Sequence, residues 1–368
     1  MKFSVGRDTL LKPLQLVAGV VERRQTLPVL SNVLFEVRGD HLRLTGTDME
    51  VEMVASLALA QAAQDGETTI PARKLLDIVK SLPADTELKF ERDGQKITLK
   101  CGRSRYSLAT LPASEFPNIE QGMGNQSIDI DVGTLKKLID STAFSMAQQD
   151  VRYYLNGMLL EVTADRLRTV ATDGHRLAMA DANVATGIEN KVQVIVPRKG
   201  ILELSRLLTE DGDTKARLAF GGNHVRVEYG SLSFTSKLID GKFPDYARVL
   251  PQNSDKAVFA QREELRSALS RAAILSNEKY HGIRLTLSAG TLGIVANNPE
   301  QEEAHEEIVI DYRGAELEIG FNVSYLLDVL NSLKGAQVKL ALGDANSSAL
   351  VSDAENASCW YVIMPMRL

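Results

Sequence analysis

The feature that most constrains the fold of this 368-residue chain is a threefold internal repeat. The segment IPARKLLDIVKSL at 70–82 recurs as VPRKGILELSRLL at 196–208 and as FNVSYLLDVLNSL at 321–333. A second marker has copies 125 residues apart, namely LRLTGTD at 42–48, LRTVATD at 167–173 and LGIVANN at 292–298. This period is far longer than the 20–50 residues of solenoid repeats, so each copy should be a whole domain.

The boundaries of these domains are marked by proline. Phe-Pro pairs at 116–117 and 243–244 each follow a strand-like run, and proline interrupts regular structure. We therefore expect three domains, at 1–120, 127–247 and 250–368.

Each repeat shows the same succession of elements. A short strand opens it, and an amphipathic helix with apolar residues every three to four positions follows. Alternating strands, a second helix and more strands complete the order β-α-βββ-β-α-βββ. This order predicts an α+β fold, with antiparallel sheets backed by two helices per repeat. The six expected helices span 7–24, 71–82, 134–150, 197–208, 262–279 and 322–334.

Charge is divided unevenly between these elements. The chain has 42 Lys and Arg against 48 Asp and Glu, a net charge of −6. The six predicted helices carry a net +7, which leaves −13 on the remainder. If the helices share one face, an acidic protein gains a basic surface that can meet the phosphates of a polyanion without reading bases. The alternative is that solvated helix faces simply collect Lys and Arg.

The sequence lacks the motifs of common catalytic and metal sites. It has no phosphate-binding loop, no HExxH and no GxSxG, and its five histidines show no ligand spacing. Cys101 and Cys359 form no CxxC pair, which fits a reducing cytoplasm. No apolar run reaches the roughly 18 residues of a membrane span. We expect no catalytic residue, no metal and no cofactor, and a cytoplasmic protein without membrane contact.

The most enzyme-like stretch is TDGHR at 172–176, where Asp173 beside His175 suggests acid–base catalysis. The repeat, however, places Asp48 and Asn298 at the position of Asp173, each at the end of a strand. This equivalence favours a turn in which Asp or Asn bonds the local backbone. Catalysis is the less favoured alternative.

Long stretches in all three repeats resemble the bacterial DNA polymerase III beta subunit family, the sliding clamps. They include TLPVLSNVL (26–34), LTGTDMEVEM (44–53), GRSRYSLATLPASEFPN (102–118), QQDVRYYLNGML (148–159), TSKLIDGKFPDYARVLP (235–251), ILSNEKYHGIRL (274–285) and VIMPMRL at the end. The resemblance implies the clamp fold, which is a head-to-tail homodimeric ring of six similar domains around double-stranded DNA, with helices lining the pore.

In function, the resemblance implies a processivity factor and not an enzyme. Such a ring slides without sequence specificity and tethers the catalytic subunit of DNA polymerase III. Its further partners are the clamp loader complex and other polymerases and repair proteins that carry short clamp-binding motifs. Two other classes stay open, a metal-dependent nuclease and a scaffold that binds no nucleic acid. The first requires clustered acidic ligands, and the second would lack basic helix faces.

The resemblance also implies a set of residues that face DNA. They are Arg24, Arg73, Lys74, Gln149, Tyr153, Tyr154, Arg198 and Lys199. We expect Gln149, Tyr153 and Tyr154 at a helix end and in the loop at 148–154, with core packing as the alternative for the two tyrosines.

Opposite charges in the first and third repeats suggest how the ring closes. The expected interface joins basic Lys74, Lys96, Arg103 and Arg105 to acidic Glu300, Glu302, Glu303 and Glu306. As implied by the resemblance, its apolar centre consists of Tyr106, Leu108, Ile274 and Leu275. His305 interrupts the acidic run, and strand edges protected by charge are the alternative.

A groove between the second and third domains is the last site that the resemblance implies, and it accepts short peptides from partner proteins. The matching residues are Leu155, Thr172, Gly174, His175, Arg176, Leu177, Pro244, Arg248, Val249, Asn322, Tyr325, Ser348, Val362, Met364, Pro365, Met366 and Arg367. Methionine side chains repack easily, which suits several different peptides. Arg176 and Arg367 are expected to orient polar groups of the peptide. Without the resemblance, residues 362–366 would be interpreted as a core strand.

Overall fold

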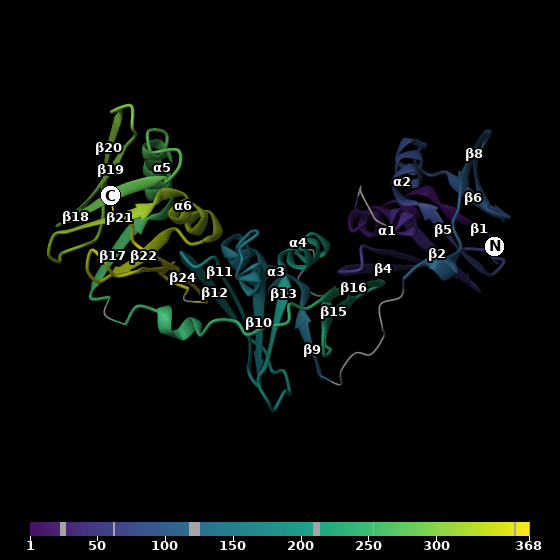
Figure 1. The fold of residues 1–368 in the computed structure, drawn as a ribbon, viewed down its shortest axis with the longest axis horizontal. Coiled ribbons are helices and arrows are strands. Elements are labelled where there is room, and N and C mark those ends of the chain that lie inside the picture. Colours follow the sequence, from purple (N-terminus) through teal and green to yellow (C-terminus); the bar gives the residue numbers. More distant parts are fainter. Residues whose placement is uncertain are drawn as a thin grey trace. The chain divides into compact units, whose positions relative to one another are not determined.

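The computed structural model describes residues 1–22, 27–61, 63–117, 126–208, 214–252, 254–356 and 358–367. Within them, each third of the chain runs in the predicted order of strands and helices. The predicted α+β fold of antiparallel sheets backed by two helices per repeat is confirmed (Figure 1).

The first repeat contains β1 (Lys2–Gly6), α1 (Arg7–Gly19), β2 (Asn32–Arg38), β3 (His41–Thr47), β4 (Val51–Ala58), β5 (Gly66–Pro71), α2 (Ala72–Ser81), β6 (Glu87–Asp93), β7 (Lys96–Cys101) and β8 (Ser104–Ala109). The second contains β9 (Gln126–Asp131), α3 (Val132–Thr142), β10 (Gly157–Thr163), β11 (Arg166–Thr172), β12 (Arg176–Asn183), β13 (Val192–Pro197), α4 (Arg198–Leu207), β14 (Lys215–Phe220), β15 (His224–Tyr229) and β16 (Leu232–Lys237). The third contains β17 (Lys256–Gln261), α5 (Arg262–Ala273), β18 (Gly282–Ser288), β19 (Thr291–Asn297), β20 (Glu303–Val309), β21 (Leu317–Asn322), α6 (Val323–Ser332), β22 (Gln337–Leu342), β23 (Ala349–Asp353) and β24 (Cys359–Ile363).

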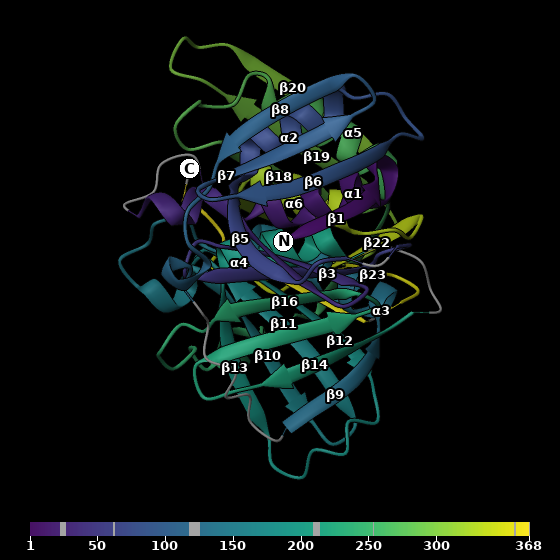
Figure 2. The ribbon, with the colours of Figure 1, turned by 90° about the vertical axis from the view of Figure 1, so that its right-hand side faces the viewer.

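Contacts divide the chain into two compact units. Unit 1 comprises Met1–Leu135 and Lys199–Leu238. It has an eight-stranded sheet in the order β5-β2-β3-β4-β16-β15-β14-β9 and a four-stranded sheet in the order β1-β6-β7-β8, whose edge strand β8 is visible in Figure 2. Helix α1 packs against α2, β3 and β4. Because β4 pairs with β16, placing Met53 opposite Phe234, strands of the first and second repeats share one sheet.

Unit 2 comprises Lys136–Arg198 and Ile239–Leu368 and is built in the same way. Its eight-stranded sheet has the order β13-β10-β11-β12-β24-β23-β22-β17, and its four-stranded sheet the order β20-β19-β18-β21. Here β12 pairs with β24, placing Ala178 opposite Tyr361, so strands of the second and third repeats share a sheet. This sharing explains why three repeats pack as two units. The predicted domain boundaries stay a prediction.

Several helices end earlier than predicted, and α3 shows why. We expected a helix over 134–150, but α3 ends at Thr142. The hydroxyls of Ser141 and Thr142 donate to main-chain carbonyl oxygens one turn back at 2.7 and 2.9 Å, bonds that compete with continuation of the helix. Gln149 therefore lies in a loop and not at a helix end, with a φ of +58°.

The helices keep their positive charge despite the shorter bounds. As folded, the six helices carry a net +6 within a chain of net −6. Their apolar stripes face the cores: Leu10, Leu14 and Val17 of α1 are fully buried, as are Leu265 and Leu269 of α5. Among the residues described, no helix is long and apolar enough to cross a bilayer.

Candidate functional site

The turn at 172–176 connects β11 to β12 and is held by its own side chains. The Asp173 carboxylate accepts hydrogen bonds from the backbone N–H groups of His175 and Arg176 at 2.9 and 3.0 Å. Thr172 Oγ1 donates to the Arg176 carbonyl oxygen at 2.6 Å and accepts from the Gly174 N–H at 3.1 Å. Gly174 has a φ of +89°, a left-handed conformation that favours glycine.

In the equivalent turns of the other repeats, the side chain at the position of Asp173 also accepts from the backbone, in the same pattern at Asp48 and over a longer turn at Asn298. Asp48 Oδ1 accepts from two backbone N–H groups at 2.9 and 2.7 Å. Asn298 Oδ1 accepts from the Glu302 N–H at 2.9 Å. The turn interpretation of 172–176 is therefore confirmed, since both carboxylate oxygens of Asp173 hold the backbone or the Arg176 side chain.

Arg176 ties this turn to two helical segments of unit 2. Its guanidinium donates to Asp173 Oδ2 at 3.1 Å, to Asp328 Oδ2 on α6 at 2.5 Å and to the Phe144 carbonyl oxygen, just after α3, at 3.0 Å. It also lies over the Tyr325 ring, 4.5 Å from the centroid. The Arg176 side chain is only 11% exposed. Its nitrogens thus join the turn at 172–176 to α6 and to the segment after α3.

The partners of Arg176 were not predicted from the sequence. Neither Asp328 nor Phe144 was among the expected site residues. A signal for Asp328 was present, because the repeat places it at the position of Glu203 in α4. Phe144 contributes a main-chain oxygen and a ring, which no motif encodes.

The C-terminal segment lies against the same turn. In the β12–β24 ladder, Leu177 is opposite Val362, and both are buried. Beyond β24 the Met364 N–H donates to the His175 carbonyl oxygen at 3.0 Å, and the Met366 N–H donates to the Gly320 carbonyl oxygen at 2.8 Å. The strand ends at Ile363, so the interpretation of 362–366 as a core strand is wrong beyond that residue.

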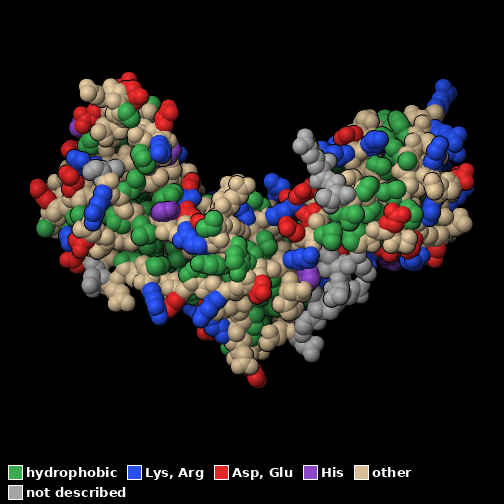
Figure 3. All heavy atoms as spheres, viewed as in Figure 1, with side chains coloured by type: hydrophobic (Ala, Val, Ile, Leu, Met, Phe, Trp, Pro, Cys, Tyr) green, Lys and Arg blue, Asp and Glu red, His purple; other side chains and the backbone are tan. Residues whose placement is uncertain are grey.

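Apolar residues gather beneath this segment in what we call the junction cluster. Its members are Leu159, Val170, Leu177, Met179, Ile195, Phe243 and Val362, with Tyr154, Ile239, Tyr246, Leu250, Leu350 and Trp360 packed against them. Figure 3 shows hydrophobic side chains at the surface of unit 2 over β12 and β24. Val249 and Met364 are 52% and 49% exposed, which offers apolar contact area to a ligand.

The other predicted groove residues also lie in unit 2. Leu155 is buried, Asn322, Tyr325, Ser348, Pro365 and Met366 are half-buried, and Pro244, Arg248 and Arg367 are exposed. Asn322 caps α6, because its side-chain oxygen accepts from the Ser324 N–H at 2.9 Å.

The loop at 148–155 is braced by Asp150. Its carboxylate accepts from Arg152 Nε and Nη2 at 3.0 and 2.8 Å, and these bonds together with one from the Arg152 N–H lower the pKa of Asp150 to about 2. Tyr153 is 57% exposed, whereas Tyr154 packs against the junction cluster. The alternative of core packing therefore fits Tyr154 and not Tyr153.

Four of the predicted DNA contacts open helices α2 and α4. Arg73 and Lys74 are exposed, whereas Arg198 Nη1 donates to the Met146 carbonyl oxygen at 3.1 Å. Lys199 Nζ pairs with Glu22 and Asp48. Burial disfavours its charge, but these carboxylates outweigh burial and raise the pKa of Lys199. Lys199 is therefore engaged within unit 1. Arg24 lies outside the described residues.

Strands β8 and β20 are edges of the two four-stranded sheets. Lys and Arg gather over β8 in unit 1, and Asp and Glu over β19 and β20 in unit 2 (Figure 3). The exposed charged residues among those predicted for the interface are Lys74, Lys96, Arg103, Arg105, Glu300, Glu302 and Glu303.

The apolar residues expected between these edges are only partly covered. Ile274 is 77% exposed, and Tyr106, Leu108 and Leu275 are half-buried. Glu306 is already paired with Arg271, at 2.6 and 2.7 Å. His305 Nε2 lies 3.1 Å from Glu303 Oε1 on the same strand.

Comparison with known proteins gives matches along the whole chain. Models of the DNA polymerase III beta subunit match in order, the N-terminal domain at residues 1–120, the central domain at 129–245 and the C-terminal domain at 247–367. The chain is 60% identical to the beta sliding clamp of Pseudomonas aeruginosa and 52% identical to that of Escherichia coli, in each case over 100% of both chains.

Solved structures agree with these matches. The crystal structure of the DNA polymerase III subunit beta from Pseudomonas aeruginosa has a TM-score of 0.98 at 60% identity, covering 100% of both chains. A structure of the sliding clamp from the same organism bound to griselimycin has the same score, identity and coverage. The griselimycin-bound clamp of Bartonella birtlesii has a TM-score of 0.96 at 37% identity, again over 100% of both chains.

Proposed function

Because this chain belongs to the DNA polymerase III beta subunit family of sliding clamps, we propose that it closes with a second copy into a ring around duplex DNA and binds partner peptides on unit 2. It is a non-catalytic processivity factor of DNA replication. We place it in the cytoplasm, where bacterial replication takes place, and propose domains at 1–120, 127–247 and 250–368.

One observation carries the proposal for DNA, the net +6 on six helices of a chain whose remainder carries −12. A basic lining attracts phosphates without reading sequence. A closed ring is linked to DNA topologically, so loose contact suffices and sliding is not hindered. Arg73, Lys74, Gln149 and Tyr153 are the best candidates for contact because they are exposed. Arg24, Tyr154, Arg198 and Lys199 complete the proposed set.

The test of this function separates topological linkage from ordinary binding. The protein, loaded on nicked circular DNA by a clamp loader complex, should stay bound when salt is raised and leave when the circle is cut. Salt weakens phosphate contacts steeply but does not open a closed ring. Retention on linear DNA with free ends would contradict the ring and indicate groove binding.

We propose that the ring closes through the β8 and β20 edges of two copies. Unpaired strand edges offer main-chain partners, and their opposite charges favour head-to-tail contact over self-pairing. Ile274, at 77% exposed in the single chain, is the apolar anchor, with Leu275, Tyr106 and Leu108 around it.

The double variant Ile274→Ala and Leu275→Ala tests this interface. Each large side chain lost from a well-packed contact costs about 2–5 kcal/mol, so sedimentation should show monomers. Val151→Ala is the matched control, because Val151 is 96% exposed and lies outside the proposed contact. A double variant that stays dimeric at nanomolar concentration would reject the assignment.

We further propose that the turn at 172–176, the C-terminal segment and Val249 form the walls of a peptide site. The exposed apolar surfaces of Val249 and Met364 above the junction cluster support this assignment. Its partners would be the catalytic subunit of DNA polymerase III, the clamp loader complex, and other polymerases and repair proteins with short apolar motifs. Griselimycin, the ligand of two solved relatives, is a suitable probe.

A further inference from the structure

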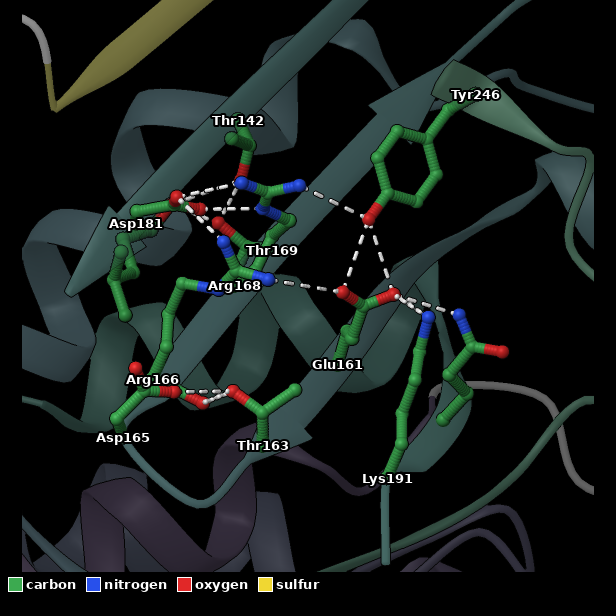
Figure 4. Close-up of polar contacts among 12 residues, drawn as sticks. Thr142, Glu161, Thr163, Asp165, Arg166, Arg168, Thr169, Asp181, Lys191 and Tyr246 are labelled. Atoms are coloured by element: carbon green, nitrogen blue, oxygen red, sulfur yellow. Dashed lines mark hydrogen bonds and ion pairs between the residues drawn. The ribbon is translucent and has the colours of Figure 1, made fainter. Parts of the chain in front are cut away.

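A buried carboxylate in unit 2 has no role in the sites described so far. Glu161, on β10, is 2% exposed and accepts hydrogen bonds from Lys191 Nζ at 2.8 Å and Gln193 Nε2 at 2.7 Å. The Tyr246 hydroxyl lies 3.1 and 3.0 Å from its two oxygens (Figure 4). A buried charge is tolerated only when it is paired in this way.

The Tyr246 hydroxyl is held from its other side as well. Arg168 Nη1 donates to it at 3.2 Å, while Arg168 Nε and Nη2 donate to the two oxygens of Asp181 at 2.6 and 2.7 Å. The bidentate pair fixes the guanidinium plane. Tyr246 thus accepts from Arg168 and donates to Glu161, and both of its hydrogen-bonding directions are satisfied (Figure 4).

Burial of Tyr246 raises the pKa of its phenol, so the hydroxyl keeps its proton at neutral pH. Burial also works against the charge on Glu161. Hydrogen bonds from Lys191, Gln193 and Tyr246 outweigh this effect and leave the pKa of Glu161 below its usual value. Glu161 is therefore ionised and can accept a hydrogen bond, and the Tyr246 hydroxyl is protonated and can donate it.

Tyr246 begins a short 3-10 segment, Tyr246–Val249, that carries two residues of the proposed peptide site. Its ring packs against the junction cluster, which contains Leu177 and Val362. Arg248 is 84% exposed in its side chain and, within the part of the chain that the structure describes, pairs with the nearby Asp245 at 2.9 Å. Phe243 and Leu250 on either side of the segment also pack on the junction cluster, but among the described side-chain hydrogen bonds of the segment those of the Tyr246 hydroxyl are the ones that reach the sheet.

We propose that Tyr246 is a positioning residue, whose hydroxyl, held between Glu161 and Arg168, fixes the segment that presents Val249 to the ligand. This inference rests on the proposed peptide site and deepens it. The residue is not expected to touch the ligand. Because Tyr246 already fixes this segment, less conformational entropy is lost when the ligand binds. Such preorganisation raises affinity.

The variant Tyr246→Phe removes the hydroxyl and keeps the ring. We expect griselimycin to bind about 3- to 10-fold more weakly, since an anchoring hydrogen bond to a charged group is lost. Trypsin should cleave faster after Arg248, because local opening of the segment becomes more frequent. Asp181→Asn, which loosens Arg168 without changing Tyr246, should move both readouts in the same direction by a smaller factor.

Tyr229→Phe is the matched control. Tyr229 donates to the Leu207 carbonyl oxygen in unit 1, so the control also loses a partly buried tyrosine hydrogen bond. It should leave affinity and cleavage after Arg248 within twofold of the wild type. Equal effects of the two Tyr→Phe variants, or wild-type behaviour of Tyr246→Phe in both readouts, would overturn the inference.

The cleavage measurement also separates this inference from the proposed function. If the wild-type protein binds no griselimycin, the proposed peptide site is contradicted, and cleavage alone decides the anchoring. In that case, faster cleavage of Tyr246→Phe supports the anchor, and an unchanged rate rejects it.

Discussion

The two shared sheets contain equivalent junctions, β4 with β16 in unit 1 and β12 with β24 in unit 2. Each follows an Asp-capped turn, and each ladder is extended by one more main-chain bond. The Lys237 N–H donates to the Glu50 carbonyl oxygen at 2.8 Å, and the Met364 N–H donates to that of His175 at 3.0 Å. The backbone is thus the same, and what differs is the side chains that it presents.

At the position of Arg176, unit 1 has Val51, which is buried in the core. The acid equivalent to Asp328 is Glu203 on α4. Asp328 has Arg176 as its partner at 2.5 Å. Burial raises the pKa of Glu203, although Arg206 and Lys199 oppose this effect. The two junctions therefore share a turn with the same backbone structure. In unit 2, arginine stands where unit 1 has valine, and this one difference links the turn to a helix and makes it a candidate site.

The largest effect should come from removing the segment that distinguishes the unit 2 junction. Deleting residues 364–368 removes two main-chain bonds and the exposed Met364. Griselimycin affinity, measured by fluorescence anisotropy, should fall by about 100-fold or more, since each apolar anchor contributes about 1.5–3 kcal/mol. Thermal melting should change little, because chain ends carry little global stability.

Deleting only residue 368 is the control for that truncation, because it keeps both main-chain bonds and Arg367. It should retain most of the affinity. A folded 364–368 deletion with wild-type affinity would reject the C-terminal segment as a wall of the site.

Breaking the arginine link should have the next largest effect. Arg176→Ala leaves Asp173 Oδ2, Asp328 and the Phe144 carbonyl oxygen without the guanidinium donor, so the free energy of unfolding should drop by about 2–3 kcal/mol. The expected drop is moderate because the Asp328 side chain is 43% exposed, so water screens its ion pair with Arg176. Urea unfolding followed by the fluorescence of Trp360, the single tryptophan, measures the drop.

The equivalent variant in unit 1 sharpens this result. Val51→Ala should also destabilise, by about 1–2 kcal/mol, through lost burial. Only Arg176→Ala should weaken griselimycin binding. Similar losses of affinity in both variants would mean that Arg176 acts through overall stability alone.

In each of the two turns one residue has a left-handed backbone conformation, and substitutions there should have a smaller effect on stability. Met49 has a φ of +76° where unit 2 has Gly174 at +89°. Met49→Gly should raise the melting temperature, since relief of the left-handed strain contributes up to about 1 kcal/mol. Gly174→Ala should lower it, because a residue with a Cβ is strained at a φ of +89° and Arg152 Nη2, 2.8 Å from the new Cβ, would have to move. Melting temperatures that change in the same direction would contradict this equivalence.

The smallest expected effect concerns Glu203 in unit 1, which pairs with Arg206 of its own helix at 2.7 Å and not with the turn. The pKa of Glu203 is raised on folding, so the carboxyl favours folding below its usual pKa of 4.5, and this contribution is lost as pH rises through the folded value. Glu203→Gln should therefore be as stable as the wild type near pH 4 and more stable at pH 7, by about 0.5 kcal/mol. Asp328→Asn, which breaks an ion pair, should be less stable at pH 7. Urea unfolding at both pH values checks the sign.

The helices, strands and turns could be predicted from the sequence because they depend mainly on residues close together in the chain. The order of elements follows from residue periodicity, and the turn at Asp173 follows from its repeats at Asp48 and Asn298. The pairing of β4 with β16 was not predicted, because alternation shows which face of a strand is buried and not which strand lies beside it. The predicted end of α3 was wrong because side-chain hydroxyls compete with the helix at Thr142.

The candidate sites show the same limit. Family resemblance identified Arg176 and Lys199, but not that each is already engaged by carboxylates. The network around Glu161 was missed entirely. It joins four strands and a distant tyrosine, and no spacing along the chain indicates such a contact.

Because β12 pairs with β24, the sheet of unit 2 can be completed only after nearly the whole chain has been synthesised. Strand β12 ends at Asn183, and its neighbour begins at Cys359. At about 5–20 residues per second, the ribosome takes roughly 10–35 s to make the chain between them. Throughout that time the nascent β12 has an unpaired edge, which is the kind of surface that recruits other strands. Strand β4 of unit 1 waits about as long for its partner, because it ends at Ala58 and β16 begins at Leu232. The newborn protein therefore exposes one such strand edge in each unit, first in unit 1 and then in unit 2, and each needs protection by chaperones until its partner strand has emerged.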